Sequence, residues 1–248
     1  MKLSYSHWLG FAAAIIAMLF VARSWMNNYG VTVPGALVDA MNDLQESKAQ
    51  GNRPARELVL TWRAELFDDT SSPVAGNPSG DMTVVEFFDY RCPCCKQVHP
   101  TIQTLLREDN NIRFVYKEWP ILGPSSVYAA KSALAARSQQ KYVAFHAALM
   151  DTRGALDEAA VQRAALSAGM DMDRLRQDLE GHADEFDDIL RRNHELAKNL
   201  QLTGTPAFII GDAIIPGIID MATMKNVIAS ARQRLPRDIG RPESASPR

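Results

Sequence analysis

The chain of 248 residues has few cysteines and no surplus of charge of either sign. All three cysteines lie within four positions, as Cys92, Cys94 and Cys95. Three cysteines are too few to stabilise a small domain by several disulfide bonds. Their clustering therefore indicates a functional site and not a set of structural disulfides. The 27 basic residues are balanced by 29 acidic ones, so no basic surplus attracts nucleic acid, and we expect no nucleic-acid partner. The 46% of hydrophobic residues excludes a disordered or collagen-like chain.

Long hydrophobic runs are also scarce, and one is found near the N-terminus. Residues Leu9 to Ala22 carry no charge and follow a short basic segment, which is the layout of a secretory signal. This run alone has the length of a cleaved signal peptide, whereas its extension from Trp8 to Trp25 has about the length that spans a bilayer. We therefore expect residues 1–26 to be a signal peptide or an inner-membrane anchor. Both alternatives place the rest of the chain in an oxidising compartment outside the cytosol.

The segment that follows is predicted to be helical and then irregular. Apolar residues at helical spacing predict helices at Pro34 to Gln50 and at Pro54 to Phe67. Their narrow apolar stripes are expected to pack on the chain's own domain, against a partner subunit or on the membrane surface. The stretch Asp68 to Asp81 is rich in Pro, Gly and Ser and predicts a linker. We assign residues 27–72 to this helical segment, a candidate for oligomerisation, with its linker, and residues 236–248 to a disordered tail.

Residues 73–235 are predicted to form one α/β domain. Strands are expected at Thr83 to Tyr90, Ile112 to Trp119, Ala207 to Ile210 and Ala213 to Ile215. Helices are expected at Cys92 to Arg107, in an insertion at about residues 125–200, and at Asp220 to Arg234. The cysteines thus follow the carboxyl end of the first of these strands, where sites of α/β sheets tend to lie.

Cys92 and Cys95 have the spacing of a redox pair. A cysteine at the start of a helix faces free backbone N–H groups and the positive end of the helix dipole, which favour its thiolate. A second thiol one turn later can attack the mixed disulfide that the first one forms. The alternative is half of a zinc site, but the chain contains no second Cys-x-x-Cys motif. The pair is therefore interpreted as a nucleophile and a resolving thiol.

The residues around the pair allow two interpretations each. Glu86 interrupts an apolar strand, so it either lies buried below the dithiol and shuttles protons or faces solvent. Cys94 is expected to be an exposed bystander, or else to join His99 as a metal ligand. His99 is otherwise expected at the surface, and so is Glu118 at the end of a strand. For the bond between Thr205 and Pro206, the residues alone favour a trans turn before a strand.

Two sequence motifs, in the order in which they occur along the chain, resemble those of a known family. FFDYRCPCCK at Phe87 to Lys96 and GTPAFII at Gly204 to Ile210, with helices between them, resemble the DsbA family of thioredoxin-fold disulfide oxidoreductases. SPVAGNPSGDMTVVEFFDY and YKEWPILGPSSVYAAKSALAA are similar in particular to its periplasmic branch related to DsbG and ScsC. The resemblance covers about Pro73 to Leu235. It implies an α/β thioredoxin fold with an inserted helical domain, preceded by an N-terminal helical segment.

The resemblance also implies roles for individual residues. Cys92 is then the nucleophile and Cys95 the resolving thiol, and Glu86 matches the buried acid that the family carries before its first cysteine. Pro206 is implied to be cis and to face the site beside Thr205. Cys94 departs from the family's pattern, because relatives usually have a residue without a thiol at that position.

The implied function is the formation, reduction or isomerisation of disulfides in exported proteins, in the periplasm of a Gram-negative bacterium. The redox-active disulfide Cys92–Cys95 would serve without any further cofactor. The implied partners are thiol- or disulfide-containing exported proteins and a membrane redox protein of the DsbB or DsbD type. The helices before residue 68 imply a dimer or trimer. The alternative function is a periplasmic copper-handling protein that binds metal through Cys92, Cys94 and Cys95.

Overall fold

The computed structural model describes residues 53–234. The expected signal or anchor at residues 1–26, the expected helix at Pro34 to Gln50 and the expected tail at residues 236–248 lie outside the described residues. Within residues 53–234, none of the helices has both the length and the apolar character that a membrane crossing requires.

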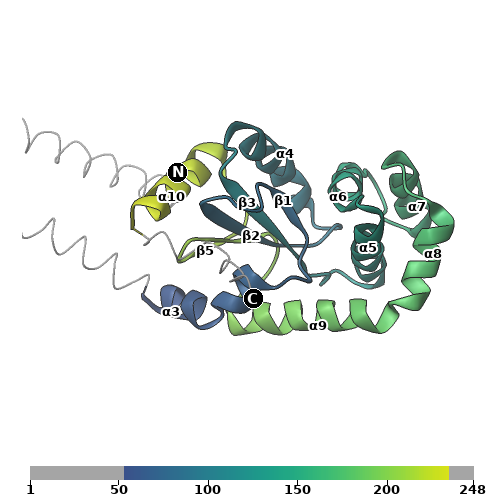
Figure 1. Ribbon diagram of the computed structural model, residues 1–248, viewed down its shortest axis with the longest axis horizontal. Coiled ribbons are helices and arrows are strands. Elements are labelled where there is room, and N and C mark those ends of the chain that lie inside the picture. Colours follow the sequence, from purple (N-terminus) through teal and green to yellow (C-terminus); the bar gives the residue numbers. More distant parts are fainter. Residues whose placement is uncertain (1–52, 235–248) are drawn as a thin grey trace, which may run out of the picture. The chain divides into compact units, whose positions relative to one another are not determined.

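One five-stranded sheet forms the centre of the domain, in the order β1-β3-β2-β4-β5 (Figure 1). The strands are β1 (Val74–Gly76), β2 (Met82–Phe88), β3 (Ile112–Glu118), β4 (Ala207–Ile210) and β5 (Ala213–Pro216). β2 and β3 are parallel, and the other neighbouring strands are antiparallel. Every residue of β2 and β3 is buried, as expected when helices cover both faces of a sheet. The four predicted strands are confirmed.

β1 lies inside the stretch that the sequence predicts to be a linker. Its three residues pair with Arg113 to Val115 of β3, at the edge of the sheet. Gly76 ends the strand with a φ of 73°, and a Cβ atom there would lie 2.5 Å from the carbonyl oxygen of Ile112. Only glycine fits this turn without strain, because it lacks the Cβ atom and tolerates a positive φ.

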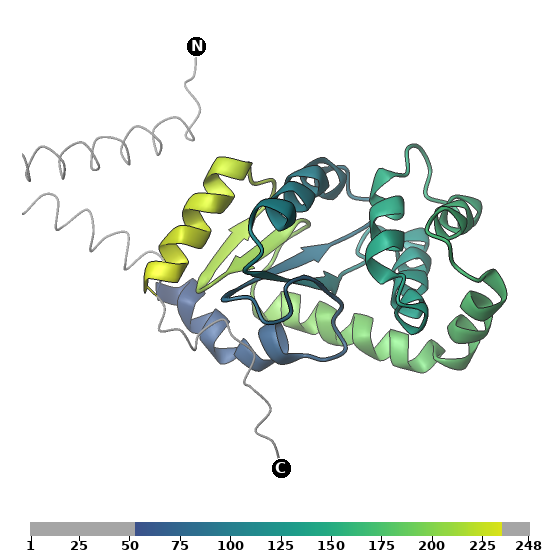
Figure 2. The same cartoon turned by 45° about the horizontal axis from the view of Figure 1, so that its top comes forward.

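Helices cover both faces of the sheet (Figures 1 and 2). The helix α4 (Pro93–Glu108) and the last helix α10 (Met221–Arg234) lie on one face, and the first described helix α3 (Arg53–Thr61) and α9 (Ala183–Asn199) lie on the other. The helical insertion between β3 and β4 consists of α5 (Pro124–Ala135), α6 (Tyr142–Asp151), α7 (Glu158–Ser167), α8 (Met172–Gly181) and α9, with a short 3-10 helix, η2 (Ala136–Gln139), after α5. The predicted helical insertion is confirmed.

The segment before the sheet packs on its own domain. α3 is followed by a π-helical turn, η1 (Ala64–Asp68), where the sequence predicts a single helix at Pro54 to Phe67. Val59, Leu66 and Phe67 of this segment are at most 1% exposed and pack with apolar residues of β2 and α9. For this helix the structure therefore favours packing on the chain's own domain over packing against a partner subunit.

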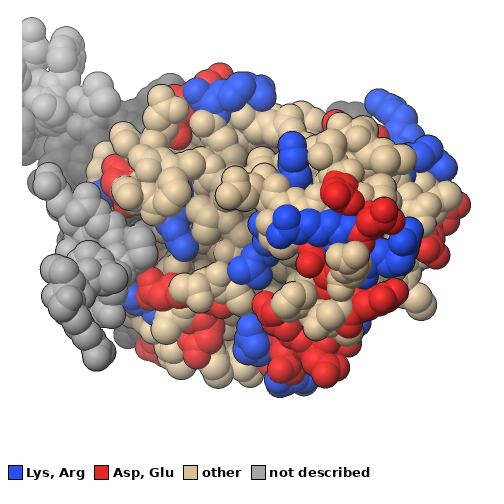
Figure 3. Space-filling model, turned by 45° about the vertical axis from the view of Figure 1, so that its right-hand side comes forward, with Lys and Arg blue, Asp and Glu red and all other residues tan. Residues whose placement is uncertain are grey.

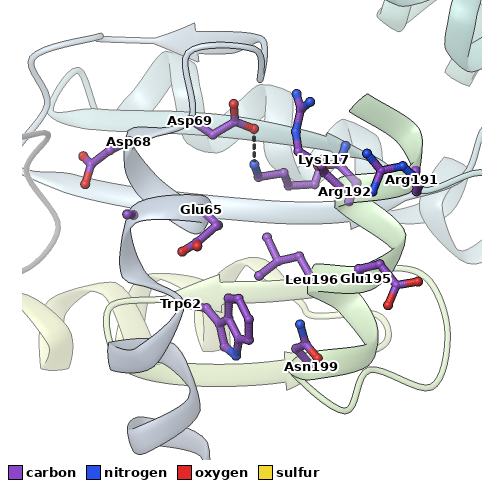
Figure 4. A pocket seen from close by; sticks show the side chains of 12 residues that line it. Trp62, Glu65, Asp68, Asp69, Lys117, Arg191, Arg192, Glu195, Leu196 and Asn199 are labelled. Carbon is purple, nitrogen blue, oxygen red and sulfur yellow. Dashed lines mark hydrogen bonds and ion pairs between the residues drawn. The ribbon is translucent and has the colours of Figure 1, made fainter. Parts of the chain in front are cut away.

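A hollow of about 520 Å³ lies between this segment and α9 (Figure 4). Lys117 of β3 enters it from the face of the sheet opposite α4, and the side chain of this lysine is only 1% exposed. Its Nζ atom lies 2.7 Å from a carboxylate oxygen of Asp69, with Trp62, Arg192 and Leu196 around the pair. The lysine is therefore a buried cation with one carboxylate partner.

The helical insertion carries charges of both signs on its surface. Figure 3 shows Lys and Arg side chains interleaved with Asp and Glu side chains on this face. Three ion pairs join residues three positions apart along α8 and α9: Arg176 with Asp173, Arg191 with Asp188, and Lys198 with Glu195. Each partner is more than half exposed, so such pairs contribute little to stability and mark a solvated face.

Candidate active site

The first cysteine caps the helix that follows β2. Cys92 is extended, with φ −71° and ψ 118°, and α4 begins at the next residue, Pro93. Proline suits this position because its fixed φ matches a first helical turn that has no use for its missing N–H. The backbone N–H of Cys92 donates to the carbonyl of Asp89 at 3.0 Å. The sulfur of Cys92 thereby lies at the N-terminal end of α4, as the sequence predicts.

The two thiols of the pair differ in acidity. Cys92, Cys94 and Cys95 are all free thiols. A hydrogen bond from the Cys95 thiol lowers the pKa of Cys92 to about 5, against the effect of burial, with help from Thr205 and from the N–H groups of Cys94 and Cys95. The same bond and burial raise the pKa of Cys95, which is completely buried. The site therefore favours the thiolate form of Cys92 and the protonated thiol form of Cys95.

The loop before β4 closes over the first cysteine. The bond between Thr205 and Pro206 is cis, as the family resemblance implies and contrary to the trans turn that the residues alone favour. The Cys92 thiol lies 3.2 Å from the carbonyl oxygen of Thr205. The carbonyl of Pro206 accepts a hydrogen bond of 2.8 Å from the N–H of Gly217, which follows β5. The strand pair β4 and β5 thus holds this loop beside α4.

Glu86 lies buried in the middle of β2, and the solvent-facing alternative is wrong. Its side chain is 1% exposed, and neither carboxylate oxygen has a hydrogen-bond partner among the residues that the structure describes. Burial, followed by the charges of Cys92 and Glu118, raises the pKa of Glu86 well above its usual value. A buried carboxyl without donors is most stable in its protonated form.

Glu118 is not the surface acid that the sequence predicts. It is 1% exposed, and one carboxylate oxygen accepts hydrogen bonds from the hydroxyls of Tyr142 at 2.7 Å and Tyr90 at 2.9 Å. Burial raises its pKa to about 8, although both hydroxyls act in the opposite direction. The expectation fails because α6, which belongs to the insertion, supplies Tyr142 and covers the end of β3.

His99 is also buried, although a surface position is predicted for it. It is 3% exposed, its Nε2 atom lies 2.8 Å from the amide nitrogen of Gln103, and its ring centroid lies 5.2 Å from that of His146 in α6. Cys94 is partly exposed. Within residues 53–234, no three His, Cys, Asp or Glu side chains form a group that could hold a metal ion. Copper binding through Cys94 or His99 stays a prediction.

Asp89 is a residue of the site that the sequence does not reveal. It is 1% exposed and accepts hydrogen bonds from the N–H of Arg91 at 2.7 Å, the N–H of Leu122 at 2.9 Å and the hydroxyl of Ser126 at 2.8 Å. These bonds join the turn before Cys92 to the start of α5. An acidic residue just after a strand is common in turns, so its type alone gave no signal.

Substitution of Asp89 by alanine is expected to destabilise the domain. The change leaves two N–H groups and one hydroxyl without their acceptor, and a single unsatisfied buried group costs about 1–3 kcal/mol. Urea unfolding should show a lower midpoint with an unchanged slope. Asp184→Ala, at an exposed position of α9, serves as the matched control, and equal midpoints for the two variants would contradict this role of Asp89.

The strand order, the cysteine pair at the start of α4 and the cis proline beside it define a dithiol site on a thioredoxin fold. Residues 83–229 match the DSBA-like thioredoxin domain family, and the chain belongs to this family. Among curated proteins, it is 29% identical over 182 residues to the Na(+)/H(+) antiporter NhaA 1 of Salinispora arenicola. This match covers 71% of the chain but only 28% of the length of the antiporter.

Several solved structures have the same fold. A thioredoxin-like oxidoreductase from Silicibacter pomeroyi is 44% identical, with a TM-score of 0.67, over 70% of this chain and 99% of its own. The catalytic domain of Proteus mirabilis ScsC is 27% identical, with a TM-score of 0.66, over 72% and 99%. A periplasmic thioredoxin-like protein from Salmonella enterica is 32% identical, with a TM-score of 0.63, over 69% and 95%.

Proposed function

We propose that the protein is a thiol-disulfide oxidoreductase that forms, reduces or isomerises disulfides in exported proteins through Cys92 and Cys95. The observation that carries this proposal is the opposite effect of the site on the two thiols. The pKa of Cys92 is lowered to about 5 by its bond with Cys95, while the pKa of Cys95 is raised. A thiolate that forms near neutral pH is both a good nucleophile and a good leaving group.

In the reducing direction, the Cys92 thiolate attacks a substrate disulfide and forms a mixed disulfide, and one substrate sulfur leaves as a thiolate. Cys95 then loses its proton and attacks the sulfur of Cys92, which releases the second substrate thiol and closes the Cys92–Cys95 disulfide. Two electrons pass from the protein to the substrate, and the reverse sequence oxidises a substrate dithiol. Glu86, which interacts electrostatically with both thiols, is the group that exchanges a proton with Cys95.

Exposed apolar side chains near the site support a protein substrate. Ile121 and Leu122 follow the end of β3 and are 39% and 41% exposed, and Ile218 follows β5 and is 46% exposed. Asp89 binds the N–H of Leu122, and the residue before Ile218 binds Pro206. These apolar side chains therefore border the dithiol on two sides, where they suit the apolar segments that an incompletely folded protein exposes.

We place the protein in the periplasm, because the apolar run before residue 26 predicts export and a similar thioredoxin-like protein of Salmonella is periplasmic. The redox-active pair serves there as its own electron carrier, without any further cofactor. A membrane protein of the DsbB or DsbD type would restore its redox state. Self-association through the helix predicted at Pro34 to Gln50 and retention at the inner membrane complete the proposal.

Titration of the Cys92 thiolate tests the proposed function directly. The ultraviolet absorbance of the thiolate in the reduced protein is expected to rise with a midpoint near pH 5. This step should disappear in Cys92→Ser and remain in Cys94→Ser. A first thiolate that forms only near the ordinary cysteine pKa of about 8.5 would remove the physical basis of the proposed exchange activity.

A further inference from the structure

Two buried carboxyl groups lie on the same face of the sheet below the dithiol. Glu86 of β2 pairs with Tyr116 of β3, and Glu118 lies two positions after Tyr116. Since alternate residues of a strand point to the same face, both carboxyls face α4, and each is 1% exposed. Two like charges in such a place do not both ionise easily, so ionisation of one carboxyl holds the proton on the other.

The hydrogen bonds decide which group ionises first. Glu118 accepts two hydroxyl donors, from Tyr142 and Tyr90, whereas Glu86 accepts none among the described residues. Donors to a carboxylate stabilise its charged form. Burial raises the pKa of both groups, that of Glu118 to about 8 and that of Glu86 well above its usual value.

A histidine lies against one of these donors. The hydroxyl of Tyr90 also lies 3.0 Å from Nδ1 of His146, which is 1% exposed. Burial and the neighbouring His99 hold the pKa of His146 well below its usual value, so the ring is neutral and carries one proton. If Nδ1 carries that proton, it donates to the oxygen of Tyr90, and the hydroxyl proton of Tyr90 points to Glu118.

The titratable groups that face the two carboxyls come from several elements. Those near Glu86 are Cys92 and Cys95 of α4 and Tyr116 and Glu118 of β3, and its partner on β4 is the uncharged Phe208. Those near Glu118 are Tyr116, Asp89, Tyr90, and Tyr142 of α6. Among the described residues that act on these two carboxyls, none is a Lys or Arg. Within this part of the chain, the charge of Glu118 therefore acts on Glu86 without a cation to offset it.

We propose that Glu118 is a positioning residue of the dithiol site: held by Tyr90 and Tyr142, it ionises before Glu86, and its charge then keeps the exchangeable proton on Glu86. The proposal rests on the proposed exchange function and adds a source for the proton of Cys95. When a substrate thiolate attacks Cys92 of the disulfide form, Cys95 leaves as a thiolate and Glu86 gives it a proton. Glu86 then regains a proton from solvent, and the substrate sulfur remains bound to Cys92.

The first test is an NMR titration of carbon-labelled glutamate in the reduced full-length protein, with the Glu86 signal assigned by Glu86→Gln. We expect Glu118→Gln to lower the pKa of Glu86 by about one unit or more, because a neighbouring negative charge is removed. Glu180→Gln, at an exposed position of α8, should leave the Glu86 titration unchanged. An unchanged Glu86 pKa in Glu118→Gln overturns the proposal.

The second test uses the pH dependence of exchange. The rate at which reduced glutathione opens the oxidised protein, divided by the glutathione thiolate concentration, should fall at alkaline pH as Glu86 loses its proton. In Glu118→Gln this fall should begin at lower pH. An identical profile in both proteins contradicts the proposal, and a merely structural role of Glu118 would not move it.

A milder variant keeps the tests decisive if Glu118→Gln does not fold. Tyr142→Phe removes one donor from Glu118 and is expected to raise the pKa of Glu118 in the same NMR titration, and an unchanged value counts against the proposal. The NMR result is independent of activity. A shift of Glu86 in a protein without exchange activity would therefore reject the proposed function while the link between the two carboxyls stands.

Discussion

Serine in place of Cys92 should reduce the catalysed reduction of insulin disulfides to the background rate of the added small thiol. The hydroxyl of serine does not ionise in the accessible pH range, so the bonds from Cys95, Thr205 and the start of α4 have no anion to stabilise. The full activity of the site depends on that anion, and the loss is therefore expected to be complete. The measurement is the turbidity of precipitating insulin chains, with equal protein concentrations.

Two further serine variants separate the roles of the neighbouring thiols. Cys95→Ser should still attack substrates but accumulate a mixed disulfide on Cys92, which non-reducing electrophoresis detects, because no second thiol is available to release it. Cys94→Ser should retain the greater part of the activity, since Cys94 contributes its backbone N–H and not its side chain to the thiolate. Insulin reduction by Cys92→Ser would refute the proposed mechanism.

Asparagine in place of Asp69 should cost about 3–5 kcal/mol of unfolding free energy, the range for removal of one partner from a buried ion pair. The substitution leaves Lys117, whose side chain is 1% exposed, without its carboxylate. Burial lowers the pKa of Lys117, and Asp69 offsets part of that effect. Asparagine keeps the shape of the side chain and the oxygen that accepts from Ser71, but its amide nitrogen replaces the oxygen that accepts from Lys117 and Ser72. Urea unfolding at neutral pH measures the difference.

A double-mutant cycle and the pH dependence provide the controls. With Lys117→Met present, Asp69→Asn should cost little, because no buried cation remains to be paired. Burial alone would raise the pKa of Asp69, but Lys117, Ser71 and Ser72 outweigh it and hold that pKa below its ordinary value. The stabilisation is therefore present above the unfolded-state pKa of about 4 and is lost as pH falls below it. A constant difference between the two proteins down to low pH would contradict the assignment.

Elements that bury a continuous apolar run were predictable from the sequence. The run from Met82 to Phe88 contains two polar residues, Thr83 and Glu86, and no Gly or Pro, and it forms β2 with close to the predicted bounds. β1 was not predictable in this way, because its residues Val74 to Gly76 show no periodicity and pair only through β3. Its stability is a property of the folded sheet and not of the segment.

Among the residues of the site, too, some were predictable from the sequence and others were not. Cys92 and Cys95 were identifiable because their chemistry depends on local spacing at a helix start. Glu118 and His99 were misplaced at the surface, because the cover over them comes from α6, whose position follows from tertiary packing. Local patterns do not report what a distant helix covers, and each of these two polar residues is buried through a contact that α6 supplies.

The bond between Cys92 and Thr205 joins positions that lie 113 residues apart. Chains are synthesised from the N-terminus, so the dithiol emerges long before the strand pair that closes over it. Until β4 joins β2, a thiol at the start of α4 has its own helix but not Thr205 beside it. The environment of the Cys92 sulfur is therefore complete only after the segment from Thr205 to β5 has joined the sheet. A chain that ends before this segment contains both cysteines but lacks the contact with Thr205.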